Sequence, residues 1–391
     1  MSILRLLAMT LLLASSTFAA DEAPATAPSV PKGEVTKHVF DPSKIFPGTM
    51  RDYWVYVPKQ YDGSKPACLY VDQDNVQFKS PGVFDQLIAS GEMPVTIGVY
   101  VAPGVVKAPS DAALDRYNRS YEFDGMSDEY ARFLIEELLP HVIADQKLNI
   151  SNDPNDRCIA GSSSGAIAAF TAAWERNDSF HRVFSAIGTY VDLRGGNIYP
   201  SLIRKFEPKT IRIFLQDGSN DNNHYGGDWW MANNEMQRAL TFAGYEVNHA
   251  WGTGKHEHTQ ADAVFADAMR WIWKDWPAPV KTGLGSEKLK EVLVPGEGWQ
   301  MVGTAGGRDD GPAANAAGEV FINDGMQTMK IGLDGKITPY AKVKTGGQAF
   351  GPDGKLYIAS GSTGEILVCD GDGHTTVVTD GIKANDLVVA H

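Results

Sequence analysis

A serine between glycines is the first feature of this sequence that could do chemistry. Residues 161–165 read Gly-Ser-Ser-Ser-Gly, after a strand-like run at 157–160 and at the start of an Ala-rich stretch with helical spacing, 164–174. Glycines in such a strand-to-helix turn permit the sharp bend that exposes the central serine, Ser163, as a nucleophile. The helix start beneath it favours negative charge, which predicts acyl transfer. A Gly/Ser turn that merely opens a helix looks the same, so the motif needs support elsewhere.

An acid and a base follow in the chain order that such a nucleophile requires. An Ile- and Leu-rich strand-like run ends in Asp217-Gly-Ser-Asn-Asp221, where a carboxylate could hold an imidazole in the correct tautomer. His256 comes after the last predicted strand and could take the serine's proton and pass it to a leaving alcohol. Two alternatives stay open, namely Asp217 as the acid and His258 as the base.

Other residues could complete this site. The backbone N–H of Ser164, directly after the serine, is placed to donate to an oxyanion. Aromatic side chains crowd the segment after the acid, where Trp229 and Trp230 could wall a pocket for an aromatic or sugar acyl group. Arg194 follows the strand after the serine turn and could face the site. Ordinary core packing would also explain the two tryptophans and is the safer interpretation, and a solvated position would explain the arginine.

Strands and helices alternate around these residues. The predicted strands are 51–57, 67–71, 95–101, 157–160, 183–187, 211–216 and 246–251, and the predicted helices are 128–144, 164–174, 233–243 and 261–273. Alternation of this kind predicts an α/β fold with a mainly parallel sheet that helices cover on both faces. We expect this domain to span residues 36–279.

The character of the sequence changes in residues 280–391. Helical spacing disappears, and three Asp-Gly pairs recur at intervals of 19 residues, at Asp334-Gly335, Asp353-Gly354 and Asp372-Gly373, each flanked by β-forming residues. Asp-Gly supplies the positive φ of tight hairpins, and regular hairpins are typical of propeller blades. The segment is too short for the four blades a propeller needs, so we expect a partial propeller, with a plain β-sandwich as the alternative.

The N-terminus indicates export. Residues 1–20 combine Arg5, an apolar run and small residues before the expected cleavage point, which is the pattern of a signal peptide, and the Pro- and Ala-rich residues 21–35 read as a linker. No other stretch is long and apolar enough for a membrane anchor. We therefore expect a periplasmic or secreted protein. Three cysteines, an odd number, leave at least one thiol free, and we expect Cys68 and Cys158 to be buried.

Composition excludes several partners. The chain has 391 residues, 43% hydrophobic and 21% charged, with a formal net charge of −13 and no run of basic residues. An acidic chain without basic clusters is a poor ligand for nucleic acid or an anionic membrane surface. We expect a small-molecule ester as the partner, and no cofactor.

Residues 36–279 resemble a known group of enzymes. The segments that carry the resemblance are 161–165, Gly-Ser-Asn-Asp221, Gly-Thr-Gly-Lys-His256, 116–124 and 133–140. They are similar to the enterochelin esterase family and to its feruloyl and acetylxylan esterase relatives, all α/β-hydrolases.

The resemblance implies a catalytic role for three residues, with Ser163 as nucleophile, His256 as base and Asp221 as acid. It also implies an oxyanion loop after the strand near residue 69. This chain reads Asp74-Asn75 there instead of the usual Asp-Gly, so the second N–H donor would come from Asn75 or Val76.

The tail resembles the start of the gluconolactonase and senescence marker protein propellers, at residues 308–312, 347–354 and 385–386. That family holds a divalent metal, for which Asp310 and Asn385 would be the matching positions here. Two ligands do not make a metal site, and we expect none. The sequence thus favours a serine esterase. Its alternatives are a metal-dependent lactonase in the tail and a non-catalytic ligand-binding protein on a hydrolase scaffold.

Overall fold

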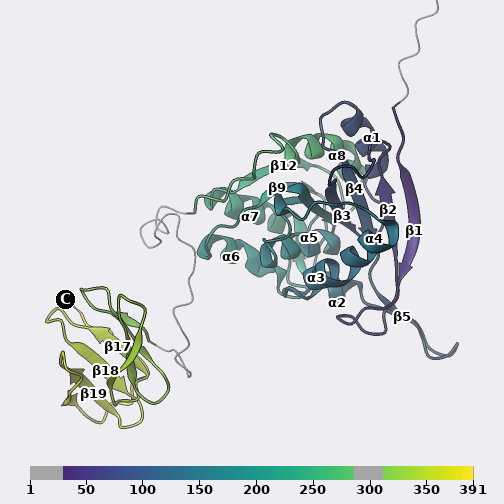
Figure 1. The fold of residues 1–391 in the computed structure, drawn as a ribbon. Helices are drawn as coiled ribbons and strands as arrows, with labels where there is room; N and C mark the ends of the chain where they lie inside the picture. The colour runs from purple at the N-terminus through teal and green to yellow at the C-terminus, as the bar shows by residue number, and fades with distance from the viewer. Residues whose placement is uncertain (1–29, 286–310, 391) are drawn as a thin grey trace, which may run out of the picture. The chain divides into compact units, whose positions relative to one another are not determined.

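Residues 30–285 and 311–390 are described by the computed structural model (Figure 1). They separate into an N-terminal unit within Met1–Leu293 and a C-terminal unit within Val294–His391, and each is treated by itself below. The signal peptide predicted at 1–20 and most of the linker lie outside the described residues.

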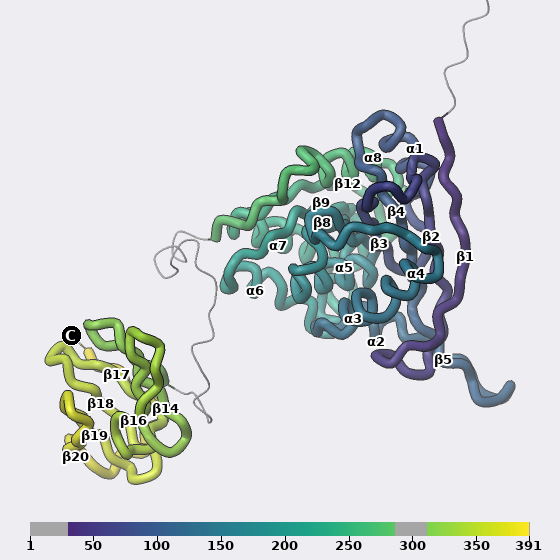
Figure 2. Tube along the Cα trace, viewed as in Figure 1, coloured from purple at the N-terminus to yellow at the C-terminus, as the bar shows by residue number. Residues whose placement is uncertain are grey.

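An eight-stranded sheet forms the centre of the N-terminal unit. Its strands are β1 (Glu34–Phe40), β2 (Arg51–Val57), β3 (Cys68–Gln73), β4 (Thr96–Val101), β7 (Arg157–Ser162), β8 (Arg182–Ala186), β9 (Arg212–Gly218) and β12 (Glu246–Gly252). They lie in the order β1-β2-β4-β3-β7-β8-β9-β12, and β1 lies at the edge (Figure 2). All neighbours from β4 to β12 are parallel, whereas β1, β2 and β4 pair antiparallel. Two short ribbons pair β5 (Val105–Val106) with β6 (Arg116–Tyr117) and β10 (Asn223–His224) with β11 (Gly227–Asp228).

Helices cover both faces of this sheet. They are α1 (Ser80–Ala89), α2 (Arg119–Phe123), α3 (Glu129–Arg132), α4 (Leu139–Gln146), α5 (Ser164–Glu175), α6 (Tyr199–Lys205), α7 (Trp229–Phe242) and α8 (Thr259–Ile272). Apolar residues of α1 and α8 form one buried cluster with the sheet, and those of α3 to α7 form the other. Two cores on opposite faces explain why the central strands are buried along their whole length.

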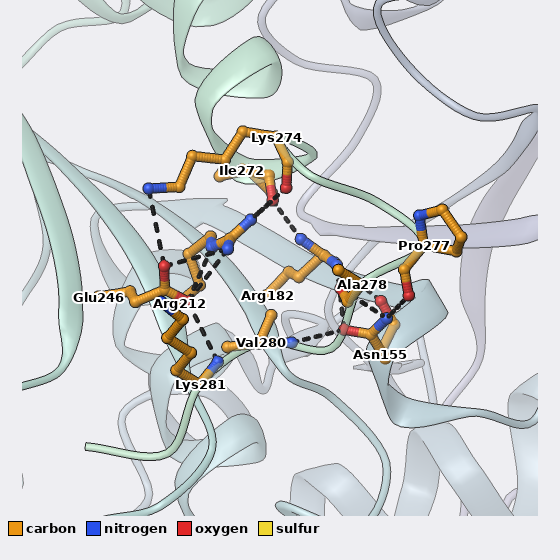
Figure 3. A network of polar contacts seen from close by, with 10 residues as sticks. All are labelled: Asn155, Arg182, Arg212, Glu246, Ile272, Lys274, Pro277, Ala278, Val280 and Lys281. Atoms are coloured by element: carbon orange, nitrogen blue, oxygen red, sulfur yellow. Dashed lines mark hydrogen bonds and ion pairs between the residues drawn. The ribbon is translucent and has the colours of Figure 1, made fainter. Parts of the chain in front are cut away.

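Two buried arginines hold the end of α8 against the sheet (Figure 3). Arg182 and Arg212 begin β8 and β9 and are 0% and 2% exposed. Both donate to the carbonyl of Ile272, the last residue of α8, and Arg212 also pairs with Glu246 at 3.0 Å. Burial, helped by the charge of Arg212, lowers the pKa of Arg182 to about 10. Because buried charges persist only with partners, this network fixes α8, whose other end follows His256.

The structure confirms the predicted α/β arrangement, with strand ends within two residues of prediction. The helix expected at 128–144 is divided into α3 and α4 by a π-helical turn at Phe133–Leu138. The short helix α2 was not predicted from the sequence, and neither were β1, α1 and α6. Strand β1 is a largely exposed edge strand with many polar residues, and α1 and α6 have a proline in their first turn that reads as a loop signal.

The C-terminal unit consists of two four-stranded antiparallel sheets, β13-β14-β15-β16 and β17-β18-β19-β20. The strands are β13 (Ala313–Ala314), β14 (Val320–Asn323), β15 (Thr328–Ile331), β16 (Ile337–Ala341), β17 (Gly347–Phe350), β18 (Leu356–Ser360), β19 (Glu365–Cys369) and β20 (Thr375–Thr379). All three repeated Asp-Gly pairs lie in hairpin turns, and their glycines have φ between 75° and 84°. The hairpin prediction is confirmed, while the propeller expected of these hairpins stays a prediction.

Two smaller expectations concern the cysteines and membrane segments. Cys68, Cys158 and Cys369 are free and buried. Within residues 30–285 and 311–390, none of the helices is long and apolar enough to span a bilayer.

Candidate active site

Ser163 occupies a strained turn between β7 and α5. Its φ of 58° and ψ of −120° are unusual for a residue with a side chain, and such backbone strain is concentrated at functional sites. The flanking glycines are required by close approach, because a Cβ on Gly161 would lie 2.3 Å from the backbone of Gly165. The turn is fixed by hydrogen bonds from Ser163 N to the Ala186 carbonyl and from Thr189 N to the Ser163 carbonyl.

The structure brings Ser163, His256 and Asp221 together. His256 Nε2 lies 2.9 Å from Ser163 Oγ, and His256 Nδ1 lies 2.5 Å from Asp221 Oδ1. The Asp221 side chain is fully buried, and that of His256 is 23% exposed. His258, the alternative base, instead contacts Ser162 Oγ at 2.9 Å.

The loops that carry the acid and the histidine meet at two glycines. A Cβ on Gly218 would lie 2.3 Å from the Gly254 carbonyl oxygen, so no larger residue fits there. The Asn220 N–H donates to the Gly254 carbonyl, and the Ser219 N–H donates to that of Gly252. This close packing at the ends of β9 and β12 sets the distance between Asp221 and His256.

Asp217, the alternative acid, lies behind Asp221. Burial, and next the Asp221 carboxylate, raises the pKa of Asp217 to about 9, so this carboxyl is protonated at neutral pH. Burial opposes ionisation of Asp221 too, but hydrogen bonds from His256, from Asp217 and from the Asn222 N–H hold its pKa below the usual range. Asp217 therefore acts as a neutral donor to Asp221, while Asp221 keeps the charge beside the imidazole.

The two candidate oxyanion donors belong to the start of α5 and to the loop after β3. Ser164 is the first residue of α5, where backbone N–H groups have no partner within the helix. Asn75 is exposed in the loop after β3, and within the described residues its N–H has no protein acceptor. The preceding Asp74 has a φ of 78° and holds Arg119 through two hydrogen bonds of 2.6 and 2.8 Å. This ion pair fixes the loop, and the sequence analysis did not assign it a role.

Arg194 lies near the serine turn without contacting the three central residues. It is exposed, and its guanidinium lies 5.7 Å from the centre of the Tyr121 ring. It also attracts the carboxylate of Asp124, although burial dominates there and raises the Asp124 pKa. Asp124 in turn accepts a hydrogen bond of 3.2 Å from Ser164 Oγ. Arg194 is thus linked to the candidate oxyanion donor Ser164 only through Asp124.

The two tryptophans begin α7 and do not lie in the acid loop, because Asp228 caps that helix through a bond from Met231 N. Trp229 is 3% exposed, and its ring packs edge-on against His256 at 5.8 Å. Protein encloses Trp229, so of the two interpretations left open for it core packing fits, and its ring supports His256. Trp230 is half-buried and packs on Trp251 at 5.4 Å.

Thr189 is a site residue that the sequence analysis missed. Its hydroxyl oxygen lies 3.2 Å from Ser163 Oγ, and it accepts a hydrogen bond of the same length from Trp229 Nε1. Thr189 follows β8, the strand next to the serine strand. Positions just beyond the carboxyl ends of parallel strands are where such folds place their sites, and this signal could have found it.

In the part of the chain that the structure describes, no three His, Cys, Asp or Glu side chains are grouped to hold a metal ion. Of the two positions matched to a propeller metal, Asp310 lies outside the described residues and Asn385 follows β20 without regular structure.

A parallel sheet that carries a strained serine turn, a histidine and a buried acid at the ends of its strands defines the class as an α/β esterase. The family described as "Putative esterase" matches residues 47–276, more than half of the chain. The chain therefore belongs to this esterase family, and it is a carboxylic ester hydrolase.

The chain is also similar to solved structures of esterases. A ferulic acid esterase is 19% identical with a TM-score of 0.49, covering 62% of this chain and 98% of that one. The enterobactin esterase from Shigella flexneri is 18% identical with a TM-score of 0.47, covering 63% and 61%, so this chain spans about three fifths of that enzyme. The feruloyl esterase module from Clostridium thermocellum is 15% identical with a TM-score of 0.46, covering 65% and 93%. No curated protein matches the chain.

Proposed function

We propose that the chain is an exported serine esterase that works through Ser163, His256, Asp221 and an acyl-enzyme intermediate. The observation that carries the proposal is the unbroken run of hydrogen bonds from Ser163 Oγ through both nitrogens of His256 to the buried Asp221 carboxylate. Serine alone is too weak a nucleophile for an ester, and a hydrogen-bonded histidine oriented by a carboxylate supplies the missing base.

In the proposed first step, Ser163 Oγ attacks the ester carbonyl carbon and its proton passes to His256 Nε2. The carbonyl oxygen becomes an oxyanion, which the N–H groups of Ser164 and Asn75 bind. The carbon–oxygen bond to the alcohol then breaks, and His256 gives the proton to the departing alkoxide. In the second step, water loses a proton to His256 and attacks the acyl carbon, and Ser163 leaves with that proton.

For the substrate, we propose an ester of the feruloyl, acetyl or siderophore-lactone type. Tyr225 is 96% exposed in the β10–β11 hairpin and stacks on His224 at 5.0 Å, and His224 packs on Trp229 at 4.7 Å. The group formed by Tyr225, His224 and Trp229 lies beside His256 and offers a flat surface on which an aromatic acyl group could stack. Trp230 and Arg194 are the further side chains we propose for substrate contact, because both are at least partly exposed. The similar solved structures are named for ferulic acid and enterobactin.

Replacing the nucleophile tests the mechanism. Ser163→Ala should reduce kcat for p-nitrophenyl acetate and methyl ferulate by about 10⁴-fold or more, because the three residues act as a unit. A fluorophosphonate should label Ser163 in the native enzyme and nothing in the variant, as peptide mapping would show. Unchanged hydrolysis by Ser163→Ala, with label on another residue, would refute the proposed mechanism.

Export and the tail's architecture are further parts of the proposal. Arg5 and the apolar run after it support a signal peptide at 1–20. N-terminal sequencing of the protein recovered outside the cytoplasm should therefore begin at residue 21, and an intact Met1 would refute this.

For residues 280–391, two successive four-stranded antiparallel sheets support the assignment as propeller-type blades.

A further inference from the structure

The hydroxyl of Thr189 joins the nucleophile to a buried tryptophan. Thr189 is 1% exposed, and its Oγ1 lies 3.2 Å from both Ser163 Oγ and Trp229 Nε1. Among the described residues it has no third side-chain partner. Its hydrogen-bonding capacity is therefore shared between these two groups.

The chemistry of the two ends determines the direction of every bond in this chain of contacts. An indole N–H can only donate, so Thr189 Oγ1 accepts from Trp229 and its own proton stays free to be donated to Ser163 Oγ. Ser163 Oγ then directs its proton to its other partner, His256 Nε2. At the far end the ionised Asp221 can only accept, which places the imidazole N–H proton on Nδ1 and leaves Nε2 to accept the Ser163 proton. The bond between Thr189 and Ser163 must then run from the Thr189 hydroxyl to Ser163 Oγ.

The backbone around Thr189 is held rigidly. Ile187 has a φ of 42°, which is rare for a β-branched residue, and its N–H donates to the Gln216 carbonyl at 2.7 Å. A Cβ on Gly188 would lie 2.4 Å from the Tyr190 ring, and the Gly188 carbonyl accepts from Asn233 Nδ2. Strain that several contacts enforce next to a nucleophile indicates that the position matters for function.

We infer that Thr189 is a further catalytic residue, which donates a hydrogen bond to the nucleophile oxygen, and that Trp229 is a positioning residue acting through it. The inference rests on the proposed function. The Thr189 donor keeps the Ser163 proton directed at His256 before attack. It also stabilises negative charge on Oγ when the proton leaves and again when the acyl group departs in the second step.

Two substitutions at Thr189 separate the hydroxyl from its shape. Thr189→Val keeps the volume and removes the hydroxyl, and we expect kcat and the rate of fluorophosphonate labelling to fall about tenfold with KM unchanged. Thr189→Ser restores the hydroxyl and should recover most of that loss. Thr171→Val is the matched control, since this buried hydroxyl in α5 contacts Tyr199 at 2.6 Å and lies outside the site.

The role of Trp229 is tested through its coupling to Thr189. Trp229→Phe removes the N–H and should lower kcat by a few fold, because Thr189 Oγ1 then loses the hydrogen bond that fixes its position beside Ser163. In the double variant with Thr189→Val this substitution should add almost nothing, since its route to the nucleophile is gone. Additive losses would contradict the positioning role.

The outcomes separate this inference from the proposed function. Native kcat and labelling rate in a folded Thr189→Val, with Ser163→Ala inactive, would overturn the inference alone. Equal losses in Thr189→Val and Thr171→Val would also overturn it, since they would indicate a general effect of removing a buried hydroxyl. Activity in Ser163→Ala would instead overturn the proposed function.

Discussion

The two units differ in the residue types that have a positive backbone φ. In the C-terminal unit, every described residue with positive φ is a glycine. In the N-terminal unit such angles also occur at residues with side chains, which are Asp74, Phe78, Lys79, Lys147, Ser163, Ile187 and Asp275. Glycine adopts this conformation without steric cost, whereas another residue there costs about 1–3 kcal/mol.

The strained residues are not spread evenly. Asp74 begins the candidate oxyanion loop, Ser163 is the candidate nucleophile, and Ile187 precedes the threonine that contacts it. The turns of the C-terminal unit place glycine wherever φ is positive. At the candidate site of the N-terminal unit, residues with side chains occupy such positions. Three of the seven residues thus lie at or next to the candidate site, whereas others, such as Lys79 and Lys147, cap helices α1 and α4.

The largest expected effect on kcat comes from comparing two histidines in the same loop. His256→Ala should lower kcat by about 10⁴-fold, because it removes the proposed base. His258→Ala removes a contact to Ser162, which is not strained, and should cost less than tenfold. Steady-state kinetics with p-nitrophenyl acetate would measure both. Comparable losses would mean that both histidines belong to the reacting group.

The next test concerns pH and stability. Asp217 has a pKa of about 9 in the folded protein and about 3.9 when unfolded. Between these values the folded state holds a proton that the unfolded state has lost, so stability should fall as pH rises, by up to about 1.4 kcal/mol per pH unit. Asp217→Asn cannot titrate but can still donate to Asp221, so it should remove this decline.

Urea unfolding at pH 5.5, 7 and 8.5 would measure the effect of Asp217→Asn. The variant should gain on the native protein as pH increases, and its esterase activity should show that Asp221 still orients the histidine. Parallel stability curves for the two proteins would mean that Asp217 is ionised in the fold, and the description of the acid pair would be wrong.

A smaller effect is expected from exchanging residue types between the two kinds of turn. Ser163→Gly should relieve strain and raise the free energy of unfolding by about 1 kcal/mol while abolishing activity. Gly354→Ala, at a φ of 75° in an open hairpin turn, should lower it by about 1 kcal/mol and leave activity intact. Thermal unfolding would measure both. A loss of stability in Ser163→Gly would show that the serine turn is not a reservoir of strain.

Chain order and strand ends were sufficient to predict much of the site. A glycine-flanked serine after one strand, an acid after a later one and a histidine before the last helix led to Ser163, with two alternatives each for the acid and the base. The family resemblance then selected Asp221 and His256, which the structure brings together with Ser163. The repeated Asp-Gly pairs likewise led to the hairpins of the C-terminal unit. In both cases the evidence is local, because a turn's residue types follow from its own backbone geometry.

The remaining features depend on contacts between distant segments. Asp221, and not Asp217, contacts His256, in loops that meet where Gly218 approaches Gly254, and Thr189 reaches Ser163 from a segment that begins with the strained Ile187. Neither leaves a periodic pattern in the sequence. For Trp229 the sequence left a pocket wall and ordinary core packing open, since composition alone cannot show that the start of α7 is enclosed.

Residues 280–285, at the end of the described part of the N-terminal unit, pack against it. Residues after 279 still bond to this unit: Val280 is 4% exposed and donates to Asn155 Oδ1, and the Gly285 N–H donates to the Ala243 carbonyl. A chain that stops at Gly285 keeps these bonds, and a chain that stops at Pro279 loses them. The two truncations differ in stability but contain the same proposed catalytic residues.

We expect the smallest effect, less than threefold on kcat and KM, from removing everything after Gly285, because the proposed triad and oxyanion donors all precede it. The chain ending at Pro279 should show similar kcat with a lower midpoint of thermal unfolding, since burial of Val280 and its hydrogen bond are lost. EDTA should change neither, because the proposed mechanism uses no metal. The chain ending at Gly285 could instead be folded and monodisperse yet inactive on every ester tested. Residues beyond 285 would then be needed to shape the site, and the assignment of catalysis to the N-terminal unit alone would be wrong.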